Sequence, residues 1–221
     1  TRPFLMAPPA GFAVQPILGP LGSTIIGNAE QVDGVRALYE AILPFTRDIE
    51  LHDTARVCAA VPVLKPEFAQ IGLHEPGAAS IDVHELHQGF LRGLRARGGQ
   101  LRLDVAIRAI SRVAGGWQVE DGEETFRAPL LLNAAGAWVD QVALLAGVTP
   151  LGITPKRRSA FVFDPPEGLA TARWPFVTDF AESFYFKPDA GLLLGSCANA
   201  DPVEPHDVQP EEYDIALGIH R

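Results

Sequence analysis

The chain has 221 residues, of which 47% are hydrophobic and 20% charged, and its formal net charge is -9. This length is enough for one substantial core or two smaller ones, and the acidic balance argues against a nucleic-acid-binding surface, which is usually basic. Cys58 and Cys197 alone are too few for a disulfide framework, and no apolar run approaches the ~20 residues that span a bilayer. We therefore expect a cytoplasmic globular protein without a membrane span.

The first part of the chain predicts one strand and two helices, after an opening segment rich in apolar residues and proline from Phe4 to Pro20. Residues 23–26 are predicted to form a strand. Asn28 is expected to cap a helix that continues through Leu43, and a second, short helix is expected near residues 54–60.

A longer helix is predicted to begin at Asp82 and to stop at Gly98-Gly99. Asp82 is its expected N-cap, and Glu85 follows three residues later, which is the spacing of a capping box. The helical spacing of its apolar residues predicts one buried face, formed by Val83, Leu86, Phe90 and Leu94.

His84 and His87 lie three residues apart on this helix, a spacing that could present two imidazoles to a metal ion. No cysteine or acidic residue follows at ligand spacing. We therefore interpret both histidines as ordinary helix residues and predict no metal site.

A small antiparallel insertion is predicted after this helix. Short strands are expected at residues 101–103 and 106–110, and a hairpin is expected between residues 117–119 and 125–127. Gly115-Gly116 and Asp121-Gly122 supply the turns.

The run from Ala128 to Trp138 predicts a buried strand that ends in a turn of residues with very small side chains, Asn133-Ala134-Ala135-Gly136. Helical spacing and a glycine stop then predict a helix over residues 139–147. Such a turn allows a ligand to approach the backbone, and the following helix N-terminus offers free N–H groups. The alternative is a strand that packs closely on the next helix through small residues.

Beyond Gly147 the pattern changes to strands, expected at Ile153, at residues 159–163 and 176–177, and in a hairpin from Phe184 to Gly195. A last helix is expected to start near Pro210. Proline-rich joints at residues 150–155 and 165–166 fit crossings between domains.

These segments, taken in order, resemble the flavin-dependent amine and amino-acid oxidases of the D-amino acid oxidase family, which includes glycine oxidase and sarcosine oxidase. The resemblance rests on the helix and strand from residue 81, on the turn from Asn133 to Trp138, and on the hairpin that begins at Phe184. It implies FAD as cofactor and a substrate-facing role for Tyr185; it also implies FAD contacts for Ile107, Ala134, Ala135, Gly136 and Trp138. The alternative for Tyr185 is a cross-strand aromatic residue on a half-buried sheet.

The resemblance implies a mixed α/β and α+β fold. Residues 78–149 would belong to a Rossmann-like FAD-binding domain, and residues 1–77 and 150–221 to a substrate domain with a mainly antiparallel sheet and flanking helices. The family's G-x-G-x-x-G turn is missing, because no two glycines stand two residues apart. We expect the chain to be an internal fragment of a longer flavoprotein that lacks this N-terminal unit and the C-terminal segment, and to be inactive alone.

The implied function is oxidation of an amino acid or related amine by hydride transfer to flavin, with a small-molecule substrate and a homodimer as the candidate assembly. Two alternatives stay open. One is an FAD-dependent 2-hydroxy-acid or glycerol-3-phosphate-type dehydrogenase, and the other is a non-catalytic interaction module.

Overall fold

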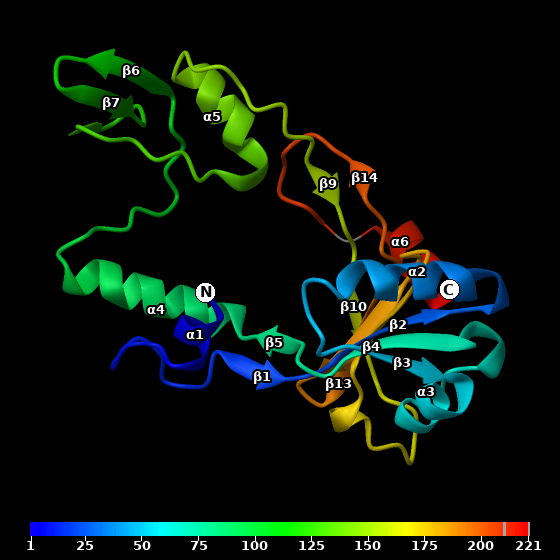
Figure 1. The fold of residues 1–221 in the computed structure, drawn as a ribbon. Helices are drawn as coiled ribbons and strands as arrows, with labels where there is room; N and C mark the ends of the chain where they lie inside the picture. Colours follow the sequence, from blue (N-terminus) through cyan, green and yellow to red (C-terminus); the bar gives the residue numbers. More distant parts are fainter. Residues whose placement is uncertain (210, 221) are drawn as a thin grey trace. The chain divides into compact units, whose positions relative to one another are not determined.

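The chain forms two compact units. A computed structural model describes residues 1–209 and 211–220; unit 1 contains Thr1–Gly98, Arg158–Asn199 and the C-terminal helix, and unit 2 contains Gly99–Arg157 and Ala200–Gln209. Unit 1 therefore combines segments from both ends of the chain, and Figure 1 shows blue and orange strands in one sheet. The boundaries predicted at residues 77 and 149 separate an FAD-binding domain from a substrate domain. That functional division stays a prediction.

Unit 1 is built on a seven-stranded sheet. Neighbouring strands pair antiparallel, except that β11 and β2 run parallel. The order across the sheet is β10 (Phe161–Phe163), β13 (Leu192–Ser196), β12 (Tyr185–Asp189), β11 (Phe176–Asp179), β2 (Ser23–Gly27), β4 (Ile71–Glu75) and β3 (Glu50–Asp53). The predicted strand at residues 23–26 and the predicted C-terminal hairpin are both confirmed, as is the mainly antiparallel sheet.

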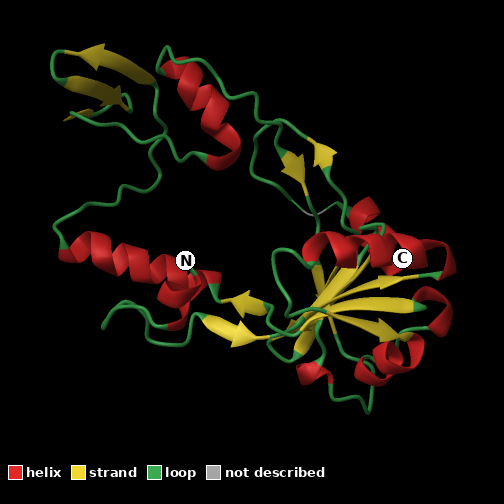
Figure 2. Ribbon diagram, in the orientation of Figure 1, coloured by secondary structure: helices red, strands yellow, loops and turns green. Residues whose placement is uncertain are grey.

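Helices cover both faces of this sheet (Figure 2). The helix α2 (Val32–Ile42) packs over Ile71 and Leu73, whereas α3 (Thr54–Ala60) packs over Ile26 and Val177. Successive side chains of a strand point to opposite faces, so each strand supplies both cores. Gly72 lets α3 approach closely, because a Cβ atom there would lie 2.6 Å from the Val57 Cγ2 atom.

Local caps explain where these helices begin. Asn28 accepts hydrogen bonds from the backbone N–H groups of Glu30 and Gln31, and the Gln31 side chain accepts one from the Asn28 N–H group. This reciprocal pair closes a 3-10 turn, η1 (Ala29–Gln31), before α2. The predicted cap at Asn28 is therefore confirmed, and so is the helix α3, which is capped by Asp53.

The N-terminal segment lies on the helix α4 (Val83–Ala96). Asp82 is its N-cap and accepts a hydrogen bond from the Glu85 N–H group at 2.8 Å, as predicted. The Glu85 carboxylate does not complete the expected capping box. It accepts hydrogen bonds from the Val14 N–H group and from Arg92, while the Asp82 N–H group donates to the Ile17 carbonyl oxygen.

The predicted apolar face of α4 is only partly covered. Phe90 packs against Phe4 and Phe12 with ring centroids 6.2 and 5.1 Å apart, but Val83 is 70% exposed. His84 and His87 are both exposed. The flanking elements are α1 (Arg2–Met6) and the antiparallel pair of β1 (Leu18–Pro20) with β5 (Ala79–Ile81).

Unit 2 contains a three-stranded antiparallel sheet of β6 (Ala109–Val113), β7 (Gly116–Glu120) and β8 (Thr125–Ala128). The hairpin and both predicted turns are confirmed. Asp121 closes the second turn by accepting hydrogen bonds from the N–H groups of Glu123 and Glu124. The strands predicted at residues 101–103 and 106–110 are wrong: the first is irregular, and the second begins at Ala109, so that Ile107 precedes it.

The buried strand predicted at residues 128–132 is also wrong. No described strand pairs with residues 129–132, and Leu130 and Leu132 are 79% and 83% exposed. A strand needs backbone hydrogen-bond partners on a neighbouring strand, and the apolar pattern alone does not supply them. The following helix is confirmed as η3 (Gly136–Trp138) and α5 (Val139–Leu145), with Gly147 at a φ of +64°.

The remaining elements are short. The strand expected at Ile153 is wrong, because the N–H groups of Leu151, Gly152 and Ile153 donate to the Asp140 carboxylate instead of to a sheet. The pair β9 (Lys156–Arg157) with β14 (Asp201–Pro202), the helical turns η2 (Pro66–Phe68) and η4 (Thr171–Arg173), and the helix α6 (Glu212–His220) complete the fold. Pro210, the predicted start of the last helix, lies outside the described residues.

Candidate functional site

Tyr185 lies at the first position of β12, where the sheet of unit 1 pairs it with Thr178 on β11 and Ser196 on β13. Its ring packs against Phe176, with the ring centroids 5.4 Å apart. Among the described residues, none forms a hydrogen bond with its hydroxyl group. Tyr185 therefore has a fixed ring and a hydroxyl group that is available to a ligand.

The turn before Tyr185 is held by a carboxylate. Asp179 accepts hydrogen bonds from the backbone N–H groups of Ser183 at 2.6 Å and Phe184 at 3.0 Å. The Ser183 hydroxyl group donates to the same carboxylate at 2.8 Å. An aspartate followed four residues later by serine is a local signal that could have identified this turn in the sequence.

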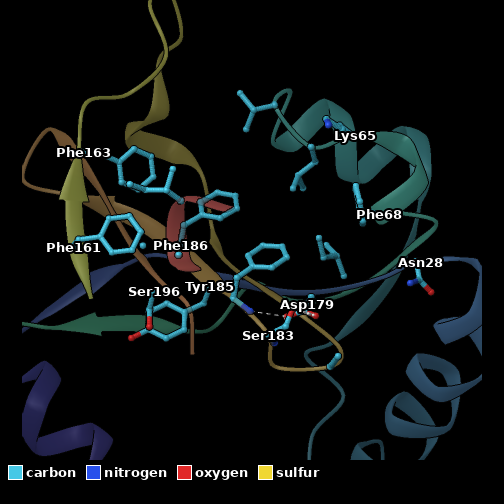
Figure 3. Close-up of a pocket in the computed structure, with 18 of the residues that line it drawn as sticks. Asn28, Lys65, Phe68, Phe161, Phe163, Asp179, Ser183, Tyr185, Phe186 and Ser196 are labelled. Atoms are coloured by element: carbon cyan, nitrogen blue, oxygen red, sulfur yellow. Dashed lines mark hydrogen bonds between the residues drawn. The ribbon is translucent and has the colours of Figure 1, made fainter. Parts of the chain in front are cut away.

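A cavity of about 950 Å³ opens at this end of the sheet (Figure 3). Its wall is mainly aromatic and aliphatic, and its polar members are Asn28, Gln31, Lys65, Asp179, Ser183 and Ser196. Pockets of this size and character hold small molecules and apolar groups. The aromatic residues that line it are Phe68, Phe161, Phe163, Phe184, Tyr185 and Phe186.

The aromatic residues at the start of β12 and just before it divide between the two faces of the sheet. Phe184 and Phe186 stack with centroids 6.4 Å apart and pack against the core beneath α3. Tyr185 lies between them in sequence, so its ring points to the other face. Figure 3 shows it beside Ser196, across the strand from Phe186. Tyr185 thus borders the cavity, while its ring lies on the face opposite to the rings of Phe184 and Phe186.

A buried polar network adjoins Ser196. Its hydroxyl group donates to the Ser159 carbonyl oxygen, and the Ser159 hydroxyl group donates to Asp214 on α6, both at 2.5 Å. Asn199 also donates to Asp214, at 3.1 Å. Asp214 is 1% exposed, so this carboxylate fixes α6 to the strand ends around Tyr185. No local sequence pattern signals this carboxylate, because its partners are 15 and 55 residues away.

The turn predicted to contact FAD lies in unit 2. Asn133 organises it: the amide nitrogen donates to the Val139 carbonyl oxygen at 2.8 Å, and the amide oxygen accepts from the Ala135 N–H group at 3.2 Å. Gly136 has a φ of +55°, a left-handed conformation that favours glycine. Nothing lies within 4 Å of the position that a Cβ atom would take there.

These surroundings fit part of a dinucleotide cofactor. The backbone of Gly136 is open, Ala134 is exposed, and Ile107 and Trp138 leave 38% and 39% of their surface uncovered. Small residues beside exposed apolar side chains suit the close approach of a flat ring. The structure brings Ala134, Ala135, Gly136 and Trp138 together in one turn. Tyr185 belongs to unit 1, and all five predicted cofactor residues belong to unit 2.

A short run of basic residues, 156–158, precedes β10, and two of its arginines have partners within the protein. Arg158 donates from Nε to the Asn199 carbonyl oxygen at 3.1 Å, and Arg157 lies 3.9 Å from the Asp201 carboxylate. None of the helices in residues 1–209 and 211–220 has the length and apolar character needed to cross a membrane.

The sequence of the chain matches a protein-family model and several curated proteins. The model of the family described as DAO, FAD-dependent oxidoreductase, matches residues 13–219. Mitochondrial dimethylglycine dehydrogenase of Mus musculus is 29% identical over 137 residues, which are 61% of this chain and 16% of that protein.

Solved structures of low sequence identity share the fold. L-proline dehydrogenase from P. horikoshii has a TM-score of 0.77 at 17% identity, covering 92% of this chain and 55% of that chain. Glycine oxidase from Geobacillus kaustophilus has a TM-score of 0.74 at 16% identity, and the match covers 92% of this chain and 54% of that chain. L-α-glycerophosphate oxidase from Mycoplasma pneumoniae has a TM-score of 0.70 at 20% identity, and the match covers 81% of this chain and 50% of that chain. The chain thus spans about half the length of these solved chains.

Proposed function

The chain belongs to the DAO family of FAD-dependent oxidoreductases, and we propose that it is the part of such an enzyme that oxidises an amino acid or a related amine. The observation that carries this proposal is Tyr185, whose hydroxyl group has no partner among the described residues and whose ring is fixed at the end of a sheet. A fixed donor with a free hydroxyl group suits the orientation of a small polar substrate.

FAD, when bound, would supply the acceptor for the hydride that leaves the amine-bearing carbon of the substrate. Ile107 would cover the adenine of FAD, and the turn from Ala134 to Trp138 would lie along the cofactor. The open backbone at Gly136 supports this assignment, because a side chain there would occupy the space that a ligand needs.

The residues of unit 1 would position the substrate. Tyr185 would donate a hydrogen bond to the substrate carboxylate or accept one from its amine, and its contact with Phe176 would keep the ring in place. Asp179 would act as a positioning residue, because it holds the turn that precedes Tyr185.

The named relatives favour an amine. Dimethylglycine dehydrogenase, proline dehydrogenase and glycine oxidase are each named for an amino acid or a derivative of one. One structural relative, the glycerophosphate oxidase, is named for a phosphorylated polyol, and it favours a second candidate function, oxidation of a hydroxyl-bearing substrate. This chain spans only part of each of these proteins, so both activities are proposals for the whole enzyme.

The test uses the purified full-length protein. We expect absorption bands near ~370 and ~450 nm from bound flavin, and anaerobic bleaching of the second band by amino acids or N-substituted amino acids. Bleaching by 2-hydroxy acids or glycerol 3-phosphate alone would establish the second candidate function instead. A protein without flavin bands, even after incubation with FAD, would contradict both and favour a non-catalytic module.

The cytoplasm, a homodimer and the inactivity of the fragment alone are further proposals. The cytoplasmic proposal is supported by the two cysteines, which are both thiols. Cell fractionation tests the location, and light scattering tests the homodimer. A flavin titration of the 221-residue chain tests whether it can bind the cofactor and act alone.

A further inference from the structure

Unit 1 contains a second cavity, of about 490 Å³, on the face of the sheet that α3 covers. It lies between α3, the turn η4 and the strands β2 and β4. Val57, Val61 and Trp174 form its apolar walls, and Thr24, His52 and His74 are polar members of its lining. No part of the proposed flavin chemistry uses these residues.

The two histidines lie against each other. The ring centroids of His52 and His74 are 4.8 Å apart at an interplanar angle of 30°. His74 Nδ1 is 2.9 Å from the Thr24 hydroxyl oxygen, and His52 Nε2 is 3.1 Å from the Glu50 carboxylate. His52 is 7% exposed and His74 is half-buried against it, so a charge on the His74 ring would be incompletely hydrated.

The charges around the pair are unbalanced. Glu50 on β3 is 2.5 Å from Arg56 on α3, so one carboxylate serves both Arg56 and His52. Arg173 on η4 borders the cavity as a further cation. The lining contains no aspartate or glutamate, and β2 contributes only the neutral Thr24 to this group. A proton on His74 would therefore lie close to His52 and Arg56, and the nearby carboxylate, Glu50, is already shared between those two residues.

We propose that His52 and His74 form a proton-operated clamp, which holds α3 on the sheet while His74 is neutral and loosens it when His74 becomes charged. The physical basis is repulsion between two stacked imidazoles beneath Arg56, in a partly buried site where Coulomb interactions are strong.

Burial, and after it the neighbouring His52, keep the pKa of His74 below its ordinary value of 6.5. The closed state therefore binds this proton more weakly than an open state in which His74 is hydrated. The clamp is complete above about pH 6.5 and weakens as the pH falls from there through the lowered pKa.

The clamp is connected to the larger cavity through the segment that follows α3. Leu64 lines both cavities, and the segment that follows α3 supplies Val63, Lys65 and Phe68 to the wall of the larger one. A loosened α3 would therefore release one wall of the cavity that Tyr185 borders. This inference concerns the conformation of unit 1 and does not depend on the identity of the substrate.

Hydrogen exchange of the full-length protein between about pH 8 and about pH 5.5, corrected for the intrinsic exchange rate, tests the clamp. We expect the protection of α3 amides to fall by up to roughly tenfold over this interval, the limit for one proton. His74→Gln, which cannot take up a proton, should abolish the fall. His87→Gln is the matched control on the exposed face of α4 and should retain it.

A pH-independent protection of α3 in the wild type, or a full pH dependence in His74→Gln, would overturn the clamp. Glu50→Gln keeps the test decisive if His74→Gln does not fold. It removes the one carboxylate that faces the pair and so lowers the pKa of His74 in the closed state further, so the loss of protection should continue to a lower pH than in the wild type. An unchanged pH dependence in Glu50→Gln would also overturn the clamp.

Discussion

The side-chain amide of Asn133 donates a hydrogen bond to the carbonyl oxygen of Val139 at 2.8 Å, and it thereby ties the small-residue turn to the first residue of α5. Asn133→Ala removes this bond and the one that Asn133 accepts from the Ala135 N–H group. We expect a loss of about 1–2 kcal/mol in the stability of unit 2, because each such bond contributes about 1 kcal/mol. Chemical denaturation monitored by amide exchange of α5 measures it, and an unchanged exchange rate would show that the turn is held by other contacts.

Two substitutions at Gly136 separate backbone strain from ligand space. Its φ of +55° is unfavourable for valine but accessible to asparagine, and both side chains would enter space that is open in the structure. If FAD occupies this space, both Gly136→Val and Gly136→Asn should lower the ratio of bound flavin to protein, with Gly136→Val also destabilising the turn. Retention of flavin by Gly136→Asn would indicate that the glycine is required by the turn and not by the cofactor.

Tyr185→Phe tests the substrate-facing assignment. The ring and its contact with Phe176 stay, and only the hydroxyl group is lost. A hydrogen bond to a charged carboxylate is worth about 1.5–3 kcal/mol, so kcat/KM should fall roughly ten- to hundredfold. Tyr213→Phe on the exposed side of α6 is the control. Equal kcat/KM values for the wild type and Tyr185→Phe would make Tyr185 a packing residue of the sheet.

Asp140→Asn should destabilise the loop after α5. The carboxylate accepts hydrogen bonds from the N–H groups of Leu151, Gly152 and Ile153 at 2.8–2.9 Å, and an amide offers one oxygen instead of two. We expect a loss of roughly 2 kcal/mol in unit 2, measured by thermal unfolding. The same change at the exposed loop residue Asp164 provides the baseline. A melting temperature no lower than that of Asp164→Asn would refute the anchoring role.

Glu85 is expected to attach the N-terminal segment to α4 in a pH-dependent manner. The hydrogen bond from the Val14 N–H group, and then that from Arg92, keep the pKa of Glu85 below its ordinary value of 4.5. A lowered carboxyl pKa stabilises the folded state above 4.5, and this contribution is lost as the pH falls through the lowered value. Glu85→Gln should therefore increase amide exchange of the residues around Val14 at neutral pH, to the level that the wild type reaches only in acid. Glu40→Gln, at an exposed position of α2, should not.

Local chemistry made several elements of this protein predictable from its sequence. Asn28 and Asp82 cap their helices with their own side chains, and Asp121-Gly122 closes its hairpin within four residues. Such contacts involve residues that are neighbours in the chain, so the identity and spacing of those residues are sufficient to predict them.

Apolar patterns alone gave less reliable predictions. Residues 101–103, 106–108 and 129–132 were expected in strands, but a strand forms only where another strand satisfies its backbone, and no described strand does so there. Ile107 is 38% exposed and precedes β6, so it is not part of the strand that was predicted to contain it. The turn around Gly136 was predictable, because small residues and a left-handed glycine are local requirements.

The sequence by itself thus determined the caps, the turns, the hairpins and the family resemblance of this chain. Only the tertiary structure decided which distant residues meet: Asp214 with Ser159, and His52 with His74. These pairs are separated by 55 and 22 residues. Asp214 on α6 meets a residue just before β10, and the two histidines meet through the register of β3 with β4. Strand order is fixed by the packing of whole elements, and no local spacing of residues encodes it.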